Sequence, residues 1–259
     1  MGDVMQRYFI KSDQLVEGQA VMIGDDAHHI ATVMRGTVGD HLVLCVQGVG
    51  SYLAEIFKIS QAEVHVRVVQ TKVEHVELPV CVTIAQGMIK GDKFDWVLQK
   101  ATECGASGFI PVAMKRSVAK LDEVKASKKI KRWQKIVLEA ARQSHRQVVP
   151  TVEGPVDLKA LVARAAEYDV CLFAYEAHLA AHQHTLAHVI AEFESGQRVL
   201  VLIGPEGGFD AFEVGLLMQA AFKAVGLGPR ILRTGTAPIY VMSAISYTLE
   251  VVSVTKGEI

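Results

Sequence analysis

The stretch RVLVLIGPEGGFD, residues 198–210, decides the fold of this chain. An apolar run typical of a buried strand ends at Gly204, and the turn that follows surrounds Glu206 with glycines. A helical pattern, DAFEVGLLMQAAF, begins at residue 210. A strand that leads through a glycine turn into a helix is the basic unit of an α/β sheet.

The same alternation runs from residue 80 to the end of the chain. Strands are predicted at 80–86, 107–114, 169–176, 198–204 and 223–228, and helices at 92–104, 127–145, 157–167, 184–194, 210–222 and 236–253. This order predicts a parallel sheet with helices on both faces, whose ligands bind beyond the carboxyl ends of the strands. Two glycine turns, 204–209 and 226–230, are expected at that edge.

The first 73 residues follow a different pattern. Apolar residues alternate or run together at 41–47, 51–59 and 62–71, with one helix candidate at 25–35. Short strands separated by glycine turns predict a small β-barrel, which often serves as a binding module. We therefore predict a barrel domain at 1–73 and an α/β domain at 74–259.

Composition limits the class of protein. Of the 259 residues half are apolar, and the net charge is −1. Four distant cysteines, with no CxxC pair, predict a reducing compartment and buried or inert thiols: Cys45, Cys81, Cys104 and Cys171. The start of the chain lacks a signal-peptide pattern, and the apolar run 236–254 contains Glu250, so we expect a cytoplasmic protein that does not span a membrane.

Charge is unevenly distributed along the chain. Residues 86–146 contain fourteen Lys or Arg and six Asp or Glu, an excess of eight positive charges. Such a patch is what binding to a phosphate backbone requires, although a solvated helix face gives the same composition.

The glycine turn at 204–208 excludes the common phosphate sites. GPEGGFD matches neither the dinucleotide motif G-x-G-x-x-G nor the P-loop. Glu206 would repel a phosphate near the start of the following helix. The turn therefore favours a ligand that is cationic or uncharged at this point, and a tight turn without a ligand is the alternative.

Many segments, in order, resemble the RsmE family of ribosomal RNA methyltransferases. They are MQRYF (5–9), HHIATVMR (28–35), IKGDKFDWVLQKATECGA (89–106), RSVAKLD (116–122), RWQKIVLEAARQSHRQVVP (132–150), FAYE (173–176), LVLIGPEGGF (200–209) and LGPRILRTGTAPIYVMSAISY (227–247). The resemblance implies S-adenosylmethionine-dependent methylation of N3 of a uridine in 16S ribosomal RNA, presented as free RNA or as the assembled small subunit.

The family also implies an architecture. It has the SPOUT fold, an α/β sheet with a carboxyl-terminal trefoil knot, preceded by a PUA-like β-barrel. Its members are homodimers whose active sites include residues of both subunits. The apolar segment 236–253 is consistent with such an interface, because a helix that is apolar almost all round must be buried on several sides.

The resemblance assigns the cofactor to residues of both glycine turns. They are Leu202, Ile203, Gly204, Glu206, Gly207 and Gly208 on one side, and Leu227, Gly228, Ile231, Leu232, Arg233, Thr236 and Ala237 on the other. A sulfonium nucleoside has no phosphate, so it is compatible with Glu206. Thr236 is also the predicted N-cap of the last helix. One position departs from the family, which usually has Glu where this chain has Gly235.

Methylation of uridine N3 removes a proton, which a carboxylate can accept or a guanidinium can compensate. Arg7, Glu103 and Arg146 are the candidate catalytic residues. Candidate RNA-binding residues are Arg35, Lys128, Lys129, Lys131, Arg132, Lys135 and Arg142. Arg142 and Arg146 are predicted one turn apart on the same helix face. The apolar residues of the same helix, including Trp133, are expected in the core.

Histidines at 178–188, spaced i, i+4, raise the question of a metal site. No carboxylate or cysteine completes the set, so we predict no metal. Two alternative functions remain: an RNA-binding homologue that has lost its cofactor site through Gly235, and a nucleotide-dependent α/β oxidoreductase.

Overall fold

The computed structural model describes residues 5–117, 123–175 and 185–252. The chain forms two compact units. The first contains the residues up to Glu77 together with Ala141–Val149, and the second contains Leu78–Ala140 and the residues from Pro150 onwards. The sequence pattern did not indicate that residues 141–149 belong with the first unit.

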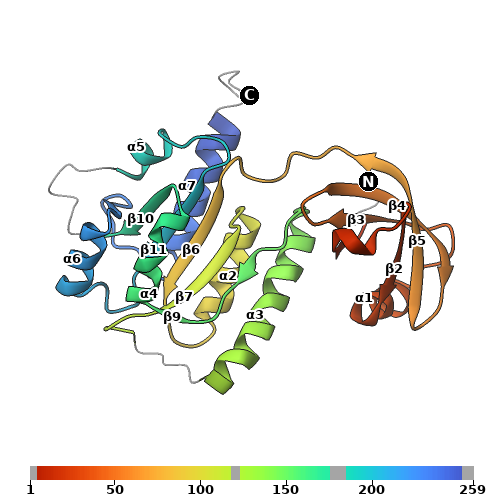
Figure 1. Ribbon diagram of the computed structural model, residues 1–259, viewed down its shortest axis with the longest axis horizontal. Helices are drawn as coiled ribbons and strands as arrows, with labels where there is room; N and C mark the ends of the chain where they lie inside the picture. The colour runs from red at the N-terminus through yellow and green to blue at the C-terminus, as the bar shows by residue number, and fades with distance from the viewer. Residues whose placement is uncertain (1–4, 118–122, 176–184, 253–259) are drawn as a thin grey trace. The chain divides into compact units, whose positions relative to one another are not determined.

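A five-stranded sheet forms the first unit (Figure 1). Its order is β1 (Arg7–Ile10), β3 (His41–Val46), β4 (Gly50–Ile59), β5 (Glu63–Lys72) and β2 (Gln19–Ile23). β1 pairs with β3 in parallel, and the remaining pairs are antiparallel. Register shifts in the β4–β5 pair, after Leu53 and after Ile56, bend these strands around the core.

The interior of this unit explains its strands. Alternate residues of β2, Ala20 and Met22, are buried, and Val64 and Val66 of β5 face the same core. The sequence analysis missed β1 and β2. β1 has only four residues, three of them buried, so it shows no alternation.

The helix predicted at 25–35 is two short helical segments. α1 (Gly24–His28) continues directly into a π-helical segment, η2 (His29–Val33), and a 3₁₀ turn, η1 (Ser12–Gln14), precedes β2. Arg35 then adopts a φ of 55°, which ends the helical stretch.

The second unit contains the predicted parallel sheet. Its order is β12 (Lys223–Val225), β10 (Val170–Ala174), β11 (Arg198–Ile203), β6 (Cys81–Gly87), β7 (Gly108–Ala113) and β8 (Thr151–Val152), and β9 (Val156–Asp157) also pairs with β7. All of these pairs are parallel. The glycine turns that follow β11 and β12 therefore lie at the same edge, as predicted.

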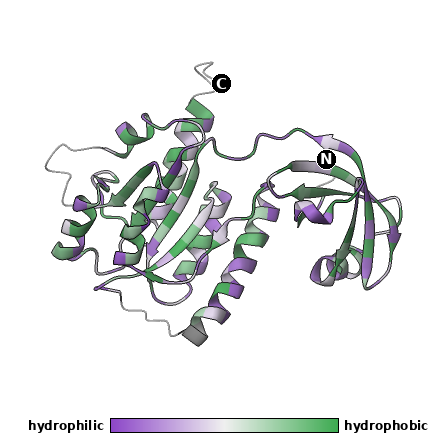
Figure 2. Cartoon of the chain, viewed as in Figure 1, coloured by the Kyte–Doolittle hydropathy of each residue, from purple (hydrophilic) through white to green (hydrophobic). Residues whose placement is uncertain are grey.

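Helices cover both faces of this sheet (Figure 1). They are α2 (Lys93–Glu103), α3 (Glu123–Gln143), α4 (Leu158–Ala163), η3 (Ala165–Glu167), α5 (Leu186–Ile190), α6 (Ala211–Gln219), α7 (Ala237–Ser246) and η5 (Tyr247–Val252). α4 and α6 contact each other, whereas α7 contacts α2 and α5. Figure 2 shows the hydrophobic residues concentrated on the strands between them.

Two aromatic residues fill the core on the α4–α6 side. Phe209 and Phe173 meet edge to face with their ring centroids 5.5 Å apart. Leu161 of α4 and Leu217 of α6 are fully buried in the same cluster. Because Phe209 directly follows the glycine turn, this packing attaches the turn to the core.

Three local features refine the sequence analysis. α7 is not buried all round: Val241, Met242 and Ile245 are buried, but Tyr240 is 40% exposed. The strand predicted at 223–228 stops at Val225. Cys45 is buried and Cys81 is exposed, and both are free thiols. In the described part of the chain, no helix has the length and apolar character needed to cross a bilayer.

Candidate functional site

The two glycine turns converge on the carbonyl oxygen of Gly204. Thr234 Oγ1, from the segment after β12, donates to this oxygen over 2.6 Å. Gln86 Nε2, near the carboxyl end of β6, donates to Thr234 Oγ1 over 3.0 Å and lies 3.5 Å from the same carbonyl. Segments that are distant in the sequence therefore meet at one point beyond the sheet edge.

The backbone of the turn passes so close to the end of β6 that Gly87 leaves no room for a side chain. A Cβ on Gly87, the last residue of β6, would lie 2.5 Å from the nitrogen of Pro205. Only a residue without a side chain permits the end of β6 to touch the turn after β11.

Glu206 is held by the segment that leads into α2. Lys93 Nζ donates to its Oε1 over 3.1 Å, and the backbone nitrogen of Lys90 lies 3.3 Å from the same oxygen. Burial alone would raise the pKa of Glu206, but hydrogen bonds from its own backbone, Lys93 and Lys90 bring the pKa below its ordinary value. The carboxylate therefore joins two loops.

Arg116 holds the other side of the turn. Its Nη1 donates to the carbonyl oxygen of Gly207 over 3.0 Å, and a Cβ on Gly207 would lie 2.8 Å from the Arg116 Cβ. Gly208 has a φ of +66°, which glycine adopts without strain. The turn is thus fixed from three sides.

The residues after the turn form a capping box at the start of α6. Asp210 is the N-cap, and its backbone nitrogen donates to Glu213 Oε2 over 2.8 Å. Glu213 also accepts from the backbone of Lys115 over 2.8 Å. A hydrogen bond from the Lys115 side chain, followed by one from the Phe212 backbone, lowers the pKa of Asp210.

The predicted cofactor residues differ in their exposure. Leu202 and Ile203 are buried in β11, so their side chains belong to the core and only their backbone can face a ligand. Ile231 is 79% exposed, whereas Ala237 is buried. The others flank the convergence point in sequence: Leu227, Gly228, Leu232, Arg233 and Thr236. Their contact with a cofactor stays a prediction.

Thr236 is the N-cap of α7 by position only. Its side chain makes no capping hydrogen bond, and its backbone is already helical with φ −88° and ψ −35°. The backbone nitrogens of Thr236 and Ala237 instead bond to the Arg233 carbonyl over 2.8 and 3.0 Å. Gly235 has open space where a Cβ would be.

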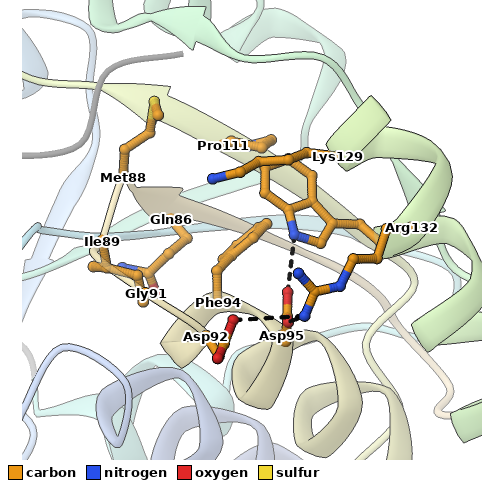
Figure 3. Close-up of a pocket in the computed structure, with 11 residues that line it drawn as sticks. Gln86, Met88, Ile89, Gly91, Asp92, Phe94, Asp95, Pro111, Lys129 and Arg132 are labelled. Atoms are coloured by element: carbon orange, nitrogen blue, oxygen red, sulfur yellow. Dashed lines mark hydrogen bonds and ion pairs between the residues drawn. The ribbon is translucent and has the colours of Figure 1, made fainter. Parts of the chain in front are cut away.

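A pocket of about 170 Å³ lies beside the glycine turn (Figure 3). Its lining residues come from the end of β6, the start of α2, β7 and α3: Gln86, Met88, Ile89, Gly91, Asp92, Phe94, Asp95, Pro111, Lys129, Arg132 and Trp133. Gln86 belongs both to this wall and to the hydrogen bonds at Gly204, so the pocket and the turn share a residue.

Trp133 confirms the interpretation of a core residue in α3. It is 5% exposed, and its ring meets Phe94 edge to face with centroids 4.8 Å apart. Its Nε1 donates to Asp95 over 3.1 Å, and Arg132 pairs with both Asp95 and Asp92.

Glu103 lies away from the convergence point. It ends α2, ten residues after Lys93, which corresponds to about 15 Å along the helix axis. Its carboxylate accepts from Lys100 over 2.8 Å. Within the second unit, Glu103 and Glu206 are thus at opposite ends of one helix, and the role predicted for Glu103 stays a prediction.

Arg7 and Arg146 are buried in the first unit. Arg7 is 5% exposed and makes two 2.8 Å hydrogen bonds to Glu74. The hydrogen bonds from Arg7 are the main cause of the lowered pKa of Glu74, which is about 2. Arg146 is 3% exposed, and its Nη2 lies 2.5 Å from Glu77.

The predicted common helix face of Arg142 and Arg146 is wrong. α3 ends at Gln143, and His145 adopts a φ of 58°, so Arg146 lies beyond the helix. Arg142 pairs with Asp26 at 2.5 Å, and its guanidinium lies 5.5 Å from the centroid of the Tyr8 ring. Both guanidiniums therefore bind the barrel unit.

The other predicted RNA-binding residues are exposed. They are Arg35, after η2, and Lys128, Lys129, Lys131, Arg132 and Lys135 of α3. This is the orientation that the amphipathic pattern predicted for α3. Whether they bind RNA stays a prediction.

Of the histidine cluster, His178, His182 and His184 lie outside the described residues. His188 Nδ1 lies 3.2 Å from Thr185 Oγ1, at the start of α5. Among the residues that the structure describes, no group of three His, Cys, Asp or Glu is placed to hold a metal ion.

Comparisons with known proteins agree with this geometry. The family described as "RNA methyltransferase domain" matches residues 76–246, and "RNA methyltransferase PUA domain" matches residues 23–69. A ribosomal RNA small subunit methyltransferase E from Bacillus subtilis is 42% identical over 250 residues, which cover 95% of this chain and 98% of that protein. The chain belongs to the ribosomal RNA small subunit methyltransferase E family.

Solved structures of this kind share the fold. The methyltransferase E of Neisseria gonorrhoeae, crystallised with S-adenosylmethionine, has a TM-score of 0.81 and 26% identity, with 95% of this chain and 98% of that chain covered. A methyltransferase from Legionella pneumophila, also bound to S-adenosylmethionine, has a TM-score of 0.80 and 27% identity, with coverages of 94% and 98%. The SPOUT-type α/β architecture with a PUA domain is thereby confirmed.

Sequence reasoning missed four residues that hold the glycine turn: Gln86, Lys93, Arg116 and Thr234. A signal existed for Gln86, because it is a polar residue at the end of a buried strand that faces the ligand edge. Thr234 and Arg116 gave no such signal, since hydrogen bonds between distant loops leave no periodic pattern.

Proposed function

We propose that this protein transfers the methyl group of S-adenosylmethionine to N3 of a uridine in 16S ribosomal RNA. The observation that carries the proposal is the meeting of both glycine turns at the Gly204 carbonyl, through Thr234 and Gln86. Membership of the methyltransferase E family supports it, as do two similar structures that contain the cofactor.

The charge of the site suits this cofactor. A phosphate near Glu206 would meet a carboxylate whose lowered pKa keeps it ionised at neutral pH. S-adenosylmethionine carries a sulfonium instead, and exposed backbone groups of the turns can bond the adenine edges. We propose that the residues of the two turns, with the carboxyl-terminal trefoil knot of the SPOUT fold, form this cofactor site.

Transfer from sulfur to nitrogen is an in-line displacement that depends on positioning. The N3 proton must leave, and Arg7, Glu103 and Arg146 stay the predicted catalytic residues. The three-sided support of the turn supplies positioning: Gln86 at Gly204, Lys93 at Glu206 and Arg116 at Gly207.

We also propose a homodimer. Tyr240 of α7 is 40% exposed, and Tyr247 and Val251 of η5 are 62% and 51% exposed. α2, which contacts α7, adds Trp96 at 55% exposure. Large apolar side chains gathered on two contacting helices are typical of a surface that another subunit covers. A cytoplasmic location follows from the proposed substrate.

Two measurements test the proposal. Isothermal calorimetry should detect S-adenosylmethionine binding that the demethylated product competes away, and mass spectrometry of ribosomal RNA from cells lacking the protein should lack one N3-methyluridine. RNA binding without cofactor binding would instead support the non-catalytic homologue. Binding of NAD or NADP would support the oxidoreductase.

A further inference from the structure

The pocket beside the glycine turn has an aromatic wall within a mixed lining, in which polar atoms expose more surface than apolar ones. Phe94 and Trp133 contribute rings, and Met88, Ile89 and Pro111 are the other apolar residues of the lining. An engineered apolar cavity of about 150 Å³ accepts a benzene molecule, so this pocket, at about 170 Å³, is suited to a single ring. A purine, with two fused rings, needs more volume than a single ring.

The rim of the pocket is polar and contains one cation that stands apart. Arg132 pairs with both Asp92 and Asp95, so this group of three charges keeps one net negative charge, which the Lys129 ammonium balances. Among the described residues, Lys129 has no ion pair; its Nζ lies 5.9 Å from the centroid of the Trp133 ring. Figure 3 shows Lys129 extending beside this aromatic wall.

The surroundings favour an anionic polymer. Lys128 and Lys131 are exposed next to Lys129 on α3, within a segment that has an excess of positive charge. Unstacked bases bind to proteins by stacking on aromatic side chains, while cationic side chains contact the backbone. A ring-sized aromatic pocket with a lysine at its mouth matches one nucleotide of single-stranded RNA.

The pocket is also connected to the cofactor turn. Gln86 lines it and bonds to Gly204 and Thr234, and the segment 90–93 bonds to Glu206. A base held here is therefore next to the loop that binds the methyl donor in the proposed function.

We propose that this pocket binds one unstacked pyrimidine base of the RNA substrate, with the adjoining phosphate on Lys129. Trp133 and Phe94 are 5% and 6% exposed, so the base meets only the small part of each ring that lines the pocket. The Lys129 ammonium leaves the Trp133 ring for the phosphate. This inference rests on the proposed function for the identity of the RNA, but the pocket itself is testable without methyl transfer.

Trp133 supplies a direct readout. The chain has two tryptophans, and Trp96 is exposed on α2, so Trp96→Phe leaves Trp133 as the only indole. In this variant without S-adenosylmethionine, pentauridylate should quench the Trp133 emission saturably. Pentaadenylate should bind at least tenfold more weakly to the pocket, and an abasic pentaribose phosphate should cause no quenching.

A charge pair on α3 supplies the matched control. Lys129→Glu should weaken pentauridylate binding about tenfold more than Lys131→Glu, because Lys131 does not line the pocket although both variants change the long-range field equally. Lys129→Ala should lower the slope of log K against log salt by about 0.7, the value for one phosphate of a single strand.

Unchanged Trp133 emission at saturating pentauridylate would overturn the inference, and so would equal effects of the two lysine variants. These outcomes are separate from the proposed function. If the protein binds S-adenosylmethionine and methylates ribosomal RNA but Trp133 emission does not change, the proposed function holds and the inference about the pocket is wrong. If pentauridylate quenches Trp133 emission but the protein does not bind S-adenosylmethionine, the inference about the pocket holds and the proposed function is wrong.

Discussion

At the scale of single residues, several charged side chains of this protein pair with groups of the same chain. Glu206 illustrates this, because a sequence reader expects a ligand at a glutamate within a glycine turn. The structure gives the carboxylate to Lys93 and to the backbone of Lys90. Arg7 and Arg146 show the same for arginines, since both are buried against glutamates.

Glu206→Gln should weaken S-adenosylmethionine binding by up to about fivefold, because an exposed ion pair contributes at most about 1 kcal/mol. Since the folded-state pKa of Glu206 is lowered, the link persists above the ordinary glutamate pKa and is lost as the pH falls through the lowered value. Calorimetry across this acidic range should show wild-type affinity falling toward that of the variant.

Glu192→Gln is the control for that experiment. Glu192 pairs with Lys223 over 3.2 Å on an exposed surface of the same unit. The Glu192→Gln variant should bind S-adenosylmethionine with the affinity of the wild type. Equal affinities of all three proteins would mean that Glu206 does not support the cofactor turn.

Glu74→Gln should lower the free energy of unfolding of the barrel unit by about 3 kcal/mol at neutral pH, because Arg7 is left buried without its carboxylate. The folded pKa of Glu74 is about 2, against an ordinary value of 4.5. The stabilisation is therefore complete above pH 4.5 and disappears between pH 4.5 and 2. Denaturant unfolding at several pH values measures both effects.

A second carboxylate on the same sheet supplies a comparison. Glu55 pairs with Arg67, which is 56% exposed. Glu55→Gln should cost less than about 1 kcal/mol. A Glu74 variant as stable as the Glu55 variant would contradict the structural role of the Arg7 pair.

At the scale of elements, the turn between β11 and α6 depends on space as much as on sequence. Gly87 and Gly207 are each in contact with another loop, whereas Gly235 borders open space. The glycines of this region therefore differ in whether a side chain would fit at their position, which the sequence alone does not reveal.

Gly207→Ala should destabilise the turn by roughly 1–3 kcal/mol and weaken cofactor binding, since its Cβ would overlap that of Arg116. Gly235→Ala should leave stability within about 0.5 kcal/mol of the wild type. Thermal unfolding and cofactor calorimetry on both variants check this. Tolerance of Gly207→Ala would mean that Arg116 does not confine the turn.

Elements with strong patterns were predictable, and contacts between loops were not. The buried runs of β6, β7, β10 and β11 and the amphipathic α3 were found within a few residues, because burial imposes periodicity. β1 and β2 are short members of a curled sheet and lacked that signal. The end of α3 was missed because a left-handed residue, His145, stops it without glycine or proline.

The site followed the same division. The edge and the two turns were predictable from parallel strands, as Gly204 shows. The pairing of Thr234 with the Gly204 carbonyl depends on how the chain returns to the sheet, which no local pattern encodes. The basic residues were predicted to contact RNA partly because their segment has an excess of positive charge. Composition cannot distinguish exposed Lys129 from buried Arg146.

At the scale of the whole molecule, the proposed dimer rests on the exposed side chains of α7 and η5. Tyr247 lies on this surface at 62% exposure. Phe212 of α6 is exposed to 67% but belongs to the helices on the other face of the sheet.

Tyr247→Asp should shift the protein from the proposed dimer to monomer in sedimentation velocity, because a carboxylate buried in an apolar interface without a partner opposes association. Phe212→Asp, a matched change at similar exposure, should sediment like the wild type. Dissociation by Phe212→Asp alone would place the interface on the α6 face.

The barrel unit takes up Ala141–Val149, and Glu77 accepts hydrogen bonds from the backbones of Gln147 and Val148 and from Arg146. During translation, its five strands leave the ribosome long before this last piece exists. Glu77 is synthesised 70 residues before its partner Gln147, and Cys45 is synthesised 101 residues before its partner Arg146. The barrel unit of the nascent chain is thus completed only after Leu78–Ala140 of the second unit has been synthesised.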